Sequence, residues 1–193
     1  MRRSRWQRGA LGLLGLVLAI GLTAAPAAAQ GPTLEQIDSR ATAWLDWAFQ
    51  DEAYTRAVEA ENRAQDQADV ADMARLSCPD GEALDKGDLW LSGDPSLPNP
   101  RPSVQERLDD GEDHIDDAEV ARALGDGAFD AANDFWNEGN YAAAATAYDT
   151  AEDLYEGASN DLLGATVDLN SADLYGGIAE SWYVAGARAV PDP

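Results

Sequence analysis

His114 is the only histidine in the chain of 193 residues, and carboxylates crowd around it. Glu112, Asp113, Asp116 and Asp117 all lie within three residues of it. One imidazole and several carboxylates form a donor set that can hold a divalent cation. Their order lacks the glycine-centred calcium loop and the paired histidines of zinc sites. We therefore interpret this segment as the solvated start of a helix, where negative charge complements the helix dipole.

The sequence offers no motif for nucleophilic or phosphoryl-transfer chemistry. It contains no glycine-flanked serine elbow, no phosphate loop and no cysteine–histidine pair. Carboxylates are so numerous that no acid–base pair stands out. We expect no catalytic residue, no metal site and no cofactor, and hence a protein that is not an enzyme. Cys78 has no second cysteine to pair with, so we expect a quiet, partly buried thiol.

Acidic residues dominate the composition. The chain has 36 Asp and Glu against 13 Lys and Arg, a formal net charge of −23. A field of this sign repels nucleic acid and anionic lipid headgroups, so neither is an expected partner. The acidity could serve cation binding or capture of a basic partner. The acids are scattered over every segment, which favours a halophilic-like adaptation that keeps the surface hydrated.

Residues 1–29 have the features of an export signal. Arg2, Arg3, Arg5 and Arg8 precede an apolar run, and small residues end at Ala29. We expect cleavage after Ala29. The remainder is then exported, to the periplasm, the envelope or the exterior, with no membrane contact after cleavage. An uncleaved anchor is the alternative, because the apolar stretch is nearly long enough to span about 30 Å of hydrocarbon.

The N-terminal helical segment covers residues 30–76. Thr33 and Gln36 resemble a capping box at its start. Apolar residues then recur at spacings of three and four until Asp51 and Glu52 interrupt them: Ile37, Ala41, Trp44, Leu45, Ala48 and Phe49. This periodicity predicts two helices or one long kinked helix.

Residues 77–113 are rich in proline and glycine, which predicts a long irregular connection. Its apolar triplet 89–91 is expected to pin part of it to the helices. We interpret the segment as a covering loop; a lid over a groove is the alternative, because loops of this length are often functional.

Helical periodicity resumes over residues 114–193. The first helix of this region is expected to end at Gly139-Asn140, and the next to cover roughly Tyr141 to Tyr155. Residues 157–160 then predict a turn before another helix begins near Leu162, and a junction falls at residues 176–177. We expect residues 30–193 to form one domain.

A repeat of thirty-four residues runs through this last region. Tyr141, Tyr148 and Ala151 recur as Tyr175, Trp182 and Ala185, and we expect the four aromatic residues to fill a core. With Gly139-Asn140 as the turn and Ala144 as a small contact residue, this segment resembles the tetratricopeptide repeat family. The resemblance covers about 60 residues, is strong from Phe135 to Leu154 and is weaker from Leu162 to Ala187.

The resemblance implies an all-α fold of antiparallel helix hairpins stacked as a short tetratricopeptide-like array. In that family, the first helix of each pair lines a concave groove that binds extended peptides. The matching positions here are Phe129, Asn133, Trp136, Asn137, Val167 and Asn170. No basic residue stands where some members grip a partner's terminal carboxylate, so that activity is not expected.

These observations predict an exported, acidic, non-catalytic scaffold or binding module for a protein or peptide. Stable arrays of this kind usually need three or more units, so the N-terminal helices or a second copy of the chain must complete the stack. A homo-oligomer is therefore compatible with the sequence. The alternative is a structural or cation-binding component of the cell envelope that uses its acidic surface.

Overall fold

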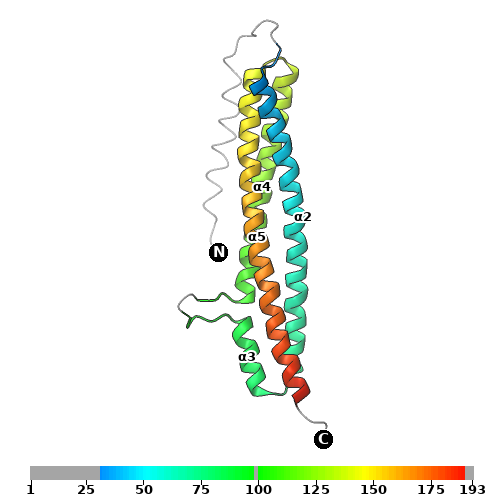
Figure 1. The fold of residues 1–193 in the computed structure, drawn as a ribbon, viewed down its shortest axis with the longest axis vertical. Helices are drawn as coiled ribbons and strands as arrows, with labels where there is room; N and C mark the ends of the chain where they lie inside the picture. Colours follow the sequence, from blue (N-terminus) through cyan, green and yellow to red (C-terminus); the bar gives the residue numbers. More distant parts are fainter. Residues whose placement is uncertain (1–30, 98–99, 190–193) are drawn as a thin grey trace. The chain divides into compact units, whose positions relative to one another are not determined.

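The computed structural model describes residues 31–97 and 100–189. It contains four described helices (Figure 1): α2 (Leu34–Leu76), α3 (Gly81–Leu91), α4 (Val104–Asn137) and α5 (Tyr141–Ala189). The all-α prediction is confirmed. Within the described residues, extended pairing is limited to an antiparallel bridge between Asp94 and Arg101. The predicted export signal lies outside the described residues.

Reciprocal side-chain caps begin two of these helices. The Thr33 amide donates to Oε1 of Gln36 at 2.9 Å, and the Gln36 amide donates to Oγ1 of Thr33 at 3.3 Å. The capping box predicted for α2 is therefore confirmed. Ser103 and Glu106 exchange the same pair of bonds at the start of α4, at 3.0 and 2.8 Å. This second capping box was not predicted, although its Ser-x-x-Glu spacing is visible in the sequence.

The turn between α4 and α5 lies where the sequence places it. Gly139 has a φ of 79°, a left-handed conformation that glycine adopts without strain. The amide of Asn140 donates to the carbonyl of Phe135 at 2.9 Å, and that of Gly139 to the carbonyl of Trp136 at 3.1 Å. These two bonds satisfy carbonyl groups that the end of α4 would leave unpaired. Asn140 directly precedes α5, and its carbonyl accepts the first hydrogen bond of that helix, from the amide of Ala144 at 3.0 Å.

The prediction of a turn at residues 157–160 is wrong. Tyr141–Ala189 is one helix of 49 residues, which continues through that segment and through Gly176 and Gly177. Ala158 is fully buried in the middle of the expected turn. Because packing stabilises a helix more than local propensity does, a run of weak helix formers can stay helical. The second hairpin expected from the resemblance is therefore not formed.

The irregular connection predicted for residues 77–113 is largely helical. Asp80 is the N-cap of α3 and accepts from the amides of Glu82 and Ala83, so Gly81 occupies the first helical position. Gly87 lies inside α3, and a side chain there would clash, since an added Cβ would lie 2.1 Å from Cε1 of Tyr183. The expected irregular structure is restricted to residues 77–80 and to the described part of 92–103.

The described residues divide into two compact units, and the boundaries fall inside α2, α4 and α5. Unit 1 contains the described residues up to Phe49 together with Val120–Gly157. Unit 2 contains Gln50–Glu119 and the described residues from Ala158 onward. Each unit thus holds a segment of all three long helices, and α3 belongs to unit 2. The two units are considered separately below.

Every seventh residue is buried along a stretch of each long helix, and most of these residues are small. The buried series in α5 is Ala144, Ala151, Ala158, Ala165, Ala172, Ala179 and Gly186. The series in α2 is Ala43, Gln50, Ala57, Ala64 and Ala71, and that in α4 is Val104, Gly111, Ala118, Gly125 and Ala132. A seven-residue period keeps one stripe of a helix against its neighbours, as in coiled coils, and small side chains let the backbones approach closely.

In unit 1, two tyrosines of α5 insert beside small residues of α4. Tyr155 packs against Gly125, and its hydroxyl donates to Oδ1 of the adjacent Asp126 at 2.8 Å. Seven residues earlier, Tyr148 lies in a core cluster with Ala132, and its hydroxyl donates to Oδ1 of Asn133 at 2.8 Å. Both rings are fully buried, and burial raises the pKa of each hydroxyl.

The same arrangement recurs in unit 2. Leu169 of α5 fills the space where Gly111 of α4 lacks a side chain. Tyr183 lies over Gly87 of α3, and its hydroxyl donates to Oδ1 of the adjacent Asp88 at 2.8 Å. For Tyr183, near the C-terminus of α5, the small residue and the hydrogen-bond acceptor therefore come from α3. For Tyr148 and Tyr155 they come from α4.

The repeat that the fold uses is therefore seven residues long rather than thirty-four. Thirty-five residues separate Tyr148 from Tyr183, a whole number of seven-residue periods, and both are fully buried. Trp182, which lies thirty-four residues from Tyr148, is 38% exposed, with the Nζ of Lys86 at 4.7 Å from its ring centroid. The prediction that Trp182 fills the core is thus wrong, whereas the same prediction for Tyr148 is confirmed.

Candidate functional site

The first turns of α2 present large apolar side chains to solvent in unit 1. Trp44 is 49% exposed, Leu45 58% and Phe49 60%. We call the exposed apolar residues of this segment the α2 stripe: Leu34, Ile37, Ala41, Trp44, Leu45, Ala48 and Phe49. It contains all six apolar residues whose periodicity predicted the first part of this helix. Ala43, which lies outside that series, is the fully buried residue of the segment.

An aromatic edge borders the stripe on the side of α4. The ring of Trp44 meets those of Trp47 and Phe129 edge-on, with centroids 5.5 and 5.3 Å apart. Phe129 in turn packs edge-on against Tyr148, at 5.4 Å. Because Trp44 is held by neighbouring rings yet half exposed, this edge presents a rigid aromatic surface.

An acidic edge lies on the side of α5. Asp46 lies three residues before Phe49, about one turn earlier in α2, and it interacts with the charges of Glu152 and Glu156 of α5. Burial raises the pKa of Asp46, and the charge of Glu156 raises it further. Burial also raises the pKa of Glu152. The negative charges of Asp46 and of nearby α5 carboxylates raise this pKa further. These carboxylates therefore repel one another at neutral pH.

Four of the six residues predicted to bind a peptide lie on α4 in unit 1. Phe129 and Trp136 are partly buried against the cluster around Tyr148, and Asn133 uses its Oδ1 to accept from the Tyr148 hydroxyl. The guanidinium carbon of Arg40 lies 4.8 Å from the Trp136 ring centroid. Asn137 is exposed at the end of α4. The predicted aromatic residues thus serve mainly to pack this unit.

The other two predicted residues, Val167 and Asn170, lie on α5 in unit 2. Both are exposed, and Asn170 accepts from Nη2 of Arg63 at 3.3 Å. The resemblance placed them on the first helix of a second hairpin. They lie instead in the middle of the continuous α5 helix.

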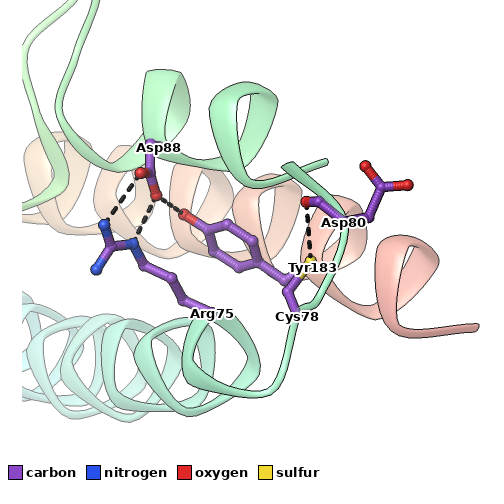
Figure 2. Close-up of polar contacts among 5 residues, drawn as sticks. All are labelled: Arg75, Cys78, Asp80, Asp88 and Tyr183. Atoms are coloured by element: carbon purple, nitrogen blue, oxygen red, sulfur yellow. Dashed lines mark hydrogen bonds and ion pairs between the residues drawn. The ribbon is translucent and has the colours of Figure 1, made fainter. Parts of the chain in front are cut away.

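A polar cluster in unit 2 joins α2, α3 and α5 (Figure 2). Arg75 donates to both oxygens of Asp88, from Nε at 2.6 Å and from Nη2 at 3.0 Å, and the Tyr183 hydroxyl donates to the same carboxylate at 2.8 Å. These bonds hold the pKa of Asp88 below its usual range. Beside them, the Cys78 thiol is buried and lies 3.6 Å from the Asp80 carbonyl oxygen. The cluster fastens α3 to its neighbours.

This cluster was not anticipated, yet the sequence contains a signal for it. The three buried tyrosines each bond a residue that directly follows an alanine or glycine: Ala132-Asn133, Gly125-Asp126 and Gly87-Asp88. The small residue admits the ring, and the next side chain accepts the hydroxyl proton. A buried hydroxyl needs such a partner.

His114 lies in the interior of α4, ten residues after Val104, so its interpretation as part of a helix start is wrong. Its Nε2 is 3.7 Å from Oδ2 of Asp168 of α5, and Arg107 also pairs with Asp168. His114 and Arg107 of α4 thus both connect to Asp168 of α5 within unit 2. No group of three or more potential metal ligands is present in the described ranges, 31–97 and 100–189.

The apolar triplet 89–91 behaves partly as predicted. Trp90 and Leu91 pack against the core cluster that contains Tyr183. The Arg101 guanidinium stacks on the Trp90 ring, with 3.8 Å from its carbon to the ring centroid. Gly93, with a φ of 79°, and the bridge at Asp94 hold the start of the connection against Arg101.

None of the described helices combines the length and the hydropathy that a bilayer crossing requires. Comparisons of the chain with protein-family models, with curated proteins and with solved structures gave no match.

Proposed function

We propose that this chain is an exported, non-catalytic helical scaffold that binds another polypeptide through the α2 stripe. The observation that carries the proposal is the exposure of Trp44, Leu45 and Phe49 on one helical segment. Soluble monomers seldom leave large apolar side chains clustered in water, and such clusters often mark interaction sites. The buried side of the same segment is occupied by Ala43, whereas Leu45 and Phe49 lie outside the core.

This site differs from the one implied by the repeat resemblance. Phe129, Asn133 and Trp136 all contact Tyr148, and the Phe129 ring also meets Trp44 of the stripe. We keep the tetratricopeptide-like relationship as a proposal for the hairpin at residues 135–154 alone. Export rests on the leader at residues 1–29, and the absence of catalysis rests on the lack of recognisable motifs in the sequence.

Cross-linking in cells that express the whole sequence tests the proposal. Leu45→Ser with Phe49→Ser removes two exposed apolar side chains of the stripe. Met73→Ser with Leu174→Ser is the matched control, because both are exposed apolar residues of unit 2. We expect a cross-linked protein that the wild type and the control share and the stripe variant loses, followed by direct binding of that purified protein. Partners that bind all three chains equally would contradict the proposal.

A further inference from the structure

The two edges of the α2 stripe differ in chemistry, and this difference restricts what can bind there. Aromatic rings border the stripe towards α4, where Trp44 meets Phe129 at 5.3 Å. Carboxylates border it towards α5, where the charge of Glu156 acts on Asp46 and the charge of Asp46 acts on Glu152. We therefore expect a partner that is apolar where it meets the stripe and basic where it meets these carboxylates.

Unit 1 as a whole adds to this field. Its described residues carry two guanidinium groups, of which that of Arg40 lies over the Trp136 ring. They carry eleven carboxylates: Glu35, Asp38, Asp46, Asp126, Asp130, Asp134, Glu138, Asp149, Glu152, Asp153 and Glu156. Complementary charge steers association and selects among partners with similar apolar faces.

We propose that the α2 stripe binds one amphipathic helix of a partner protein, with aliphatic side chains on its apolar face and lysine or arginine along the edge that meets Asp46, Glu152 and Glu156. The proposal rests on the proposed function and adds the chemistry of the partner. The stripe runs from Leu34 to Phe49, so it fits a partner helix about 22 Å long. Basic groups there would relieve the repulsion among the three carboxylates.

Other occupants fit this surface less well. A second copy of the chain would add a second set of the same carboxylates to the interface and no basic groups of the stripe, since a symmetric dimer uses the same patch twice. Anionic lipid headgroups would be repelled by the same field. A basic-edged helix is attracted by the surface that repels both.

The inference can be tested with two synthetic helical peptides of about fifteen residues, identical in their leucine and alanine face. One carries lysine along both edges and the other carries glutamine. Binding to protein recovered from cells that express the whole sequence is measured by fluorescence anisotropy. At about 0.15 M salt we expect the lysine peptide to bind about tenfold more tightly, and the preference to shrink at about 1 M salt, where charges are screened.

Variants locate the preference. Asp46→Asn with Glu152→Gln and Glu156→Gln should lose the preference for lysine while still binding the glutamine peptide. Asp130→Asn with Asp134→Asn and Glu138→Gln removes the same number of charges from exposed positions of unit 1 and should retain it.

The outcomes separate the two proposals. Equal affinity for both peptides, or a preference that survives in the first variant, would overturn the inference. The proposed function would then stand if Phe49→Ser still weakened binding of the glutamine peptide. A chain that binds neither peptide but forms a dimer that Phe49→Ser dissociates would identify a second copy as the occupant. Peptide binding that Phe49→Ser leaves unchanged would contradict both proposals.

Discussion

Single glycines set how closely α4 approaches α5 in unit 1. A Cβ added at Gly125 would lie 2.6 Å from Cε1 of Tyr155, far inside van der Waals contact. Tyr155 is fully buried and its hydroxyl is bonded to Asp126, so the ring has little freedom to move away. Gly127, two residues further along the same helix, is exposed and has no atom within 4 Å of an added Cβ.

Alanine at these two positions should change stability in opposite directions. Gly125→Ala should lower the free energy of unfolding by about 1–3 kcal/mol, because the new methyl group overpacks the site of Tyr155. Gly127→Ala should raise it by about 0.5–1 kcal/mol, because alanine loses less backbone entropy in a helix. Urea unfolding followed by far-ultraviolet circular dichroism measures both. A stabilising Gly125→Ala would show that the ring does not lie over this residue.

At the scale of the element, α5 is the helix whose continuity distinguishes this fold from a repeat array. It passes through residues 157–160, where the local residue types favour a turn. Ala151, Ala158 and Ala165 remain buried at seven-residue intervals across this segment. Their packing is the physical reason why the helix does not break.

Proline substitution tests this continuity. Ser159→Pro removes an internal helix hydrogen bond and should cost about 3 kcal/mol or more. Gly81→Pro is the control, because it falls at the first position of α3, where proline is tolerated. The preceding residue, Asp80, has φ −88° and ψ 116°, which suits a residue before proline. Thermal melting of the two variants gives the comparison, and a Ser159→Pro variant that melts like the wild type would indicate a turn at 157–160.

At the scale of the whole molecule, excess negative charge opposes folding. The formal net charge of −23 produces self-repulsion that the compact state feels more strongly than the unfolded chain. The raised pKa values of Asp46, Glu152 and Asp161 report this locally, with burial as the first cause and neighbouring carboxylates as the next. A carboxylate whose pKa is raised on folding destabilises the native state above that pKa.

Stability should therefore rise as the pH falls from 7 towards about 4.5, as these carboxylates take up protons. Below about 4 it should fall again, because the pKa of Asp88 is lowered by Arg75 and the native state loses that ion pair on protonation. Salt at about 1 M should flatten the first of these trends by screening. Melting temperatures across this pH range, at low and high salt, check the prediction. A maximum at neutral pH would contradict it.

Single residues and short spacings determined the local features of this protein. Helical periodicity, the Thr33 capping box and the Gly139-Asn140 turn need only neighbouring residues, and all are present as expected. The acidic charge is a property of composition alone. Caps and turns follow from the sequence because they depend on groups within a few positions of one another, and net charge follows because it is a sum over the residues.

Only the tertiary structure decided which side of each helix is buried. Phe49 belongs to the apolar periodicity of α2 and is exposed, whereas Ala43 lies outside that periodicity and is buried. Close helix packing selects small side chains, and hydrophobicity does not distinguish them from large ones. The same long-range packing keeps α5 helical past residue 157 and brings Asp88 to Tyr183. Partners 95 residues apart in the sequence are chosen by the fold, because no local rule connects them.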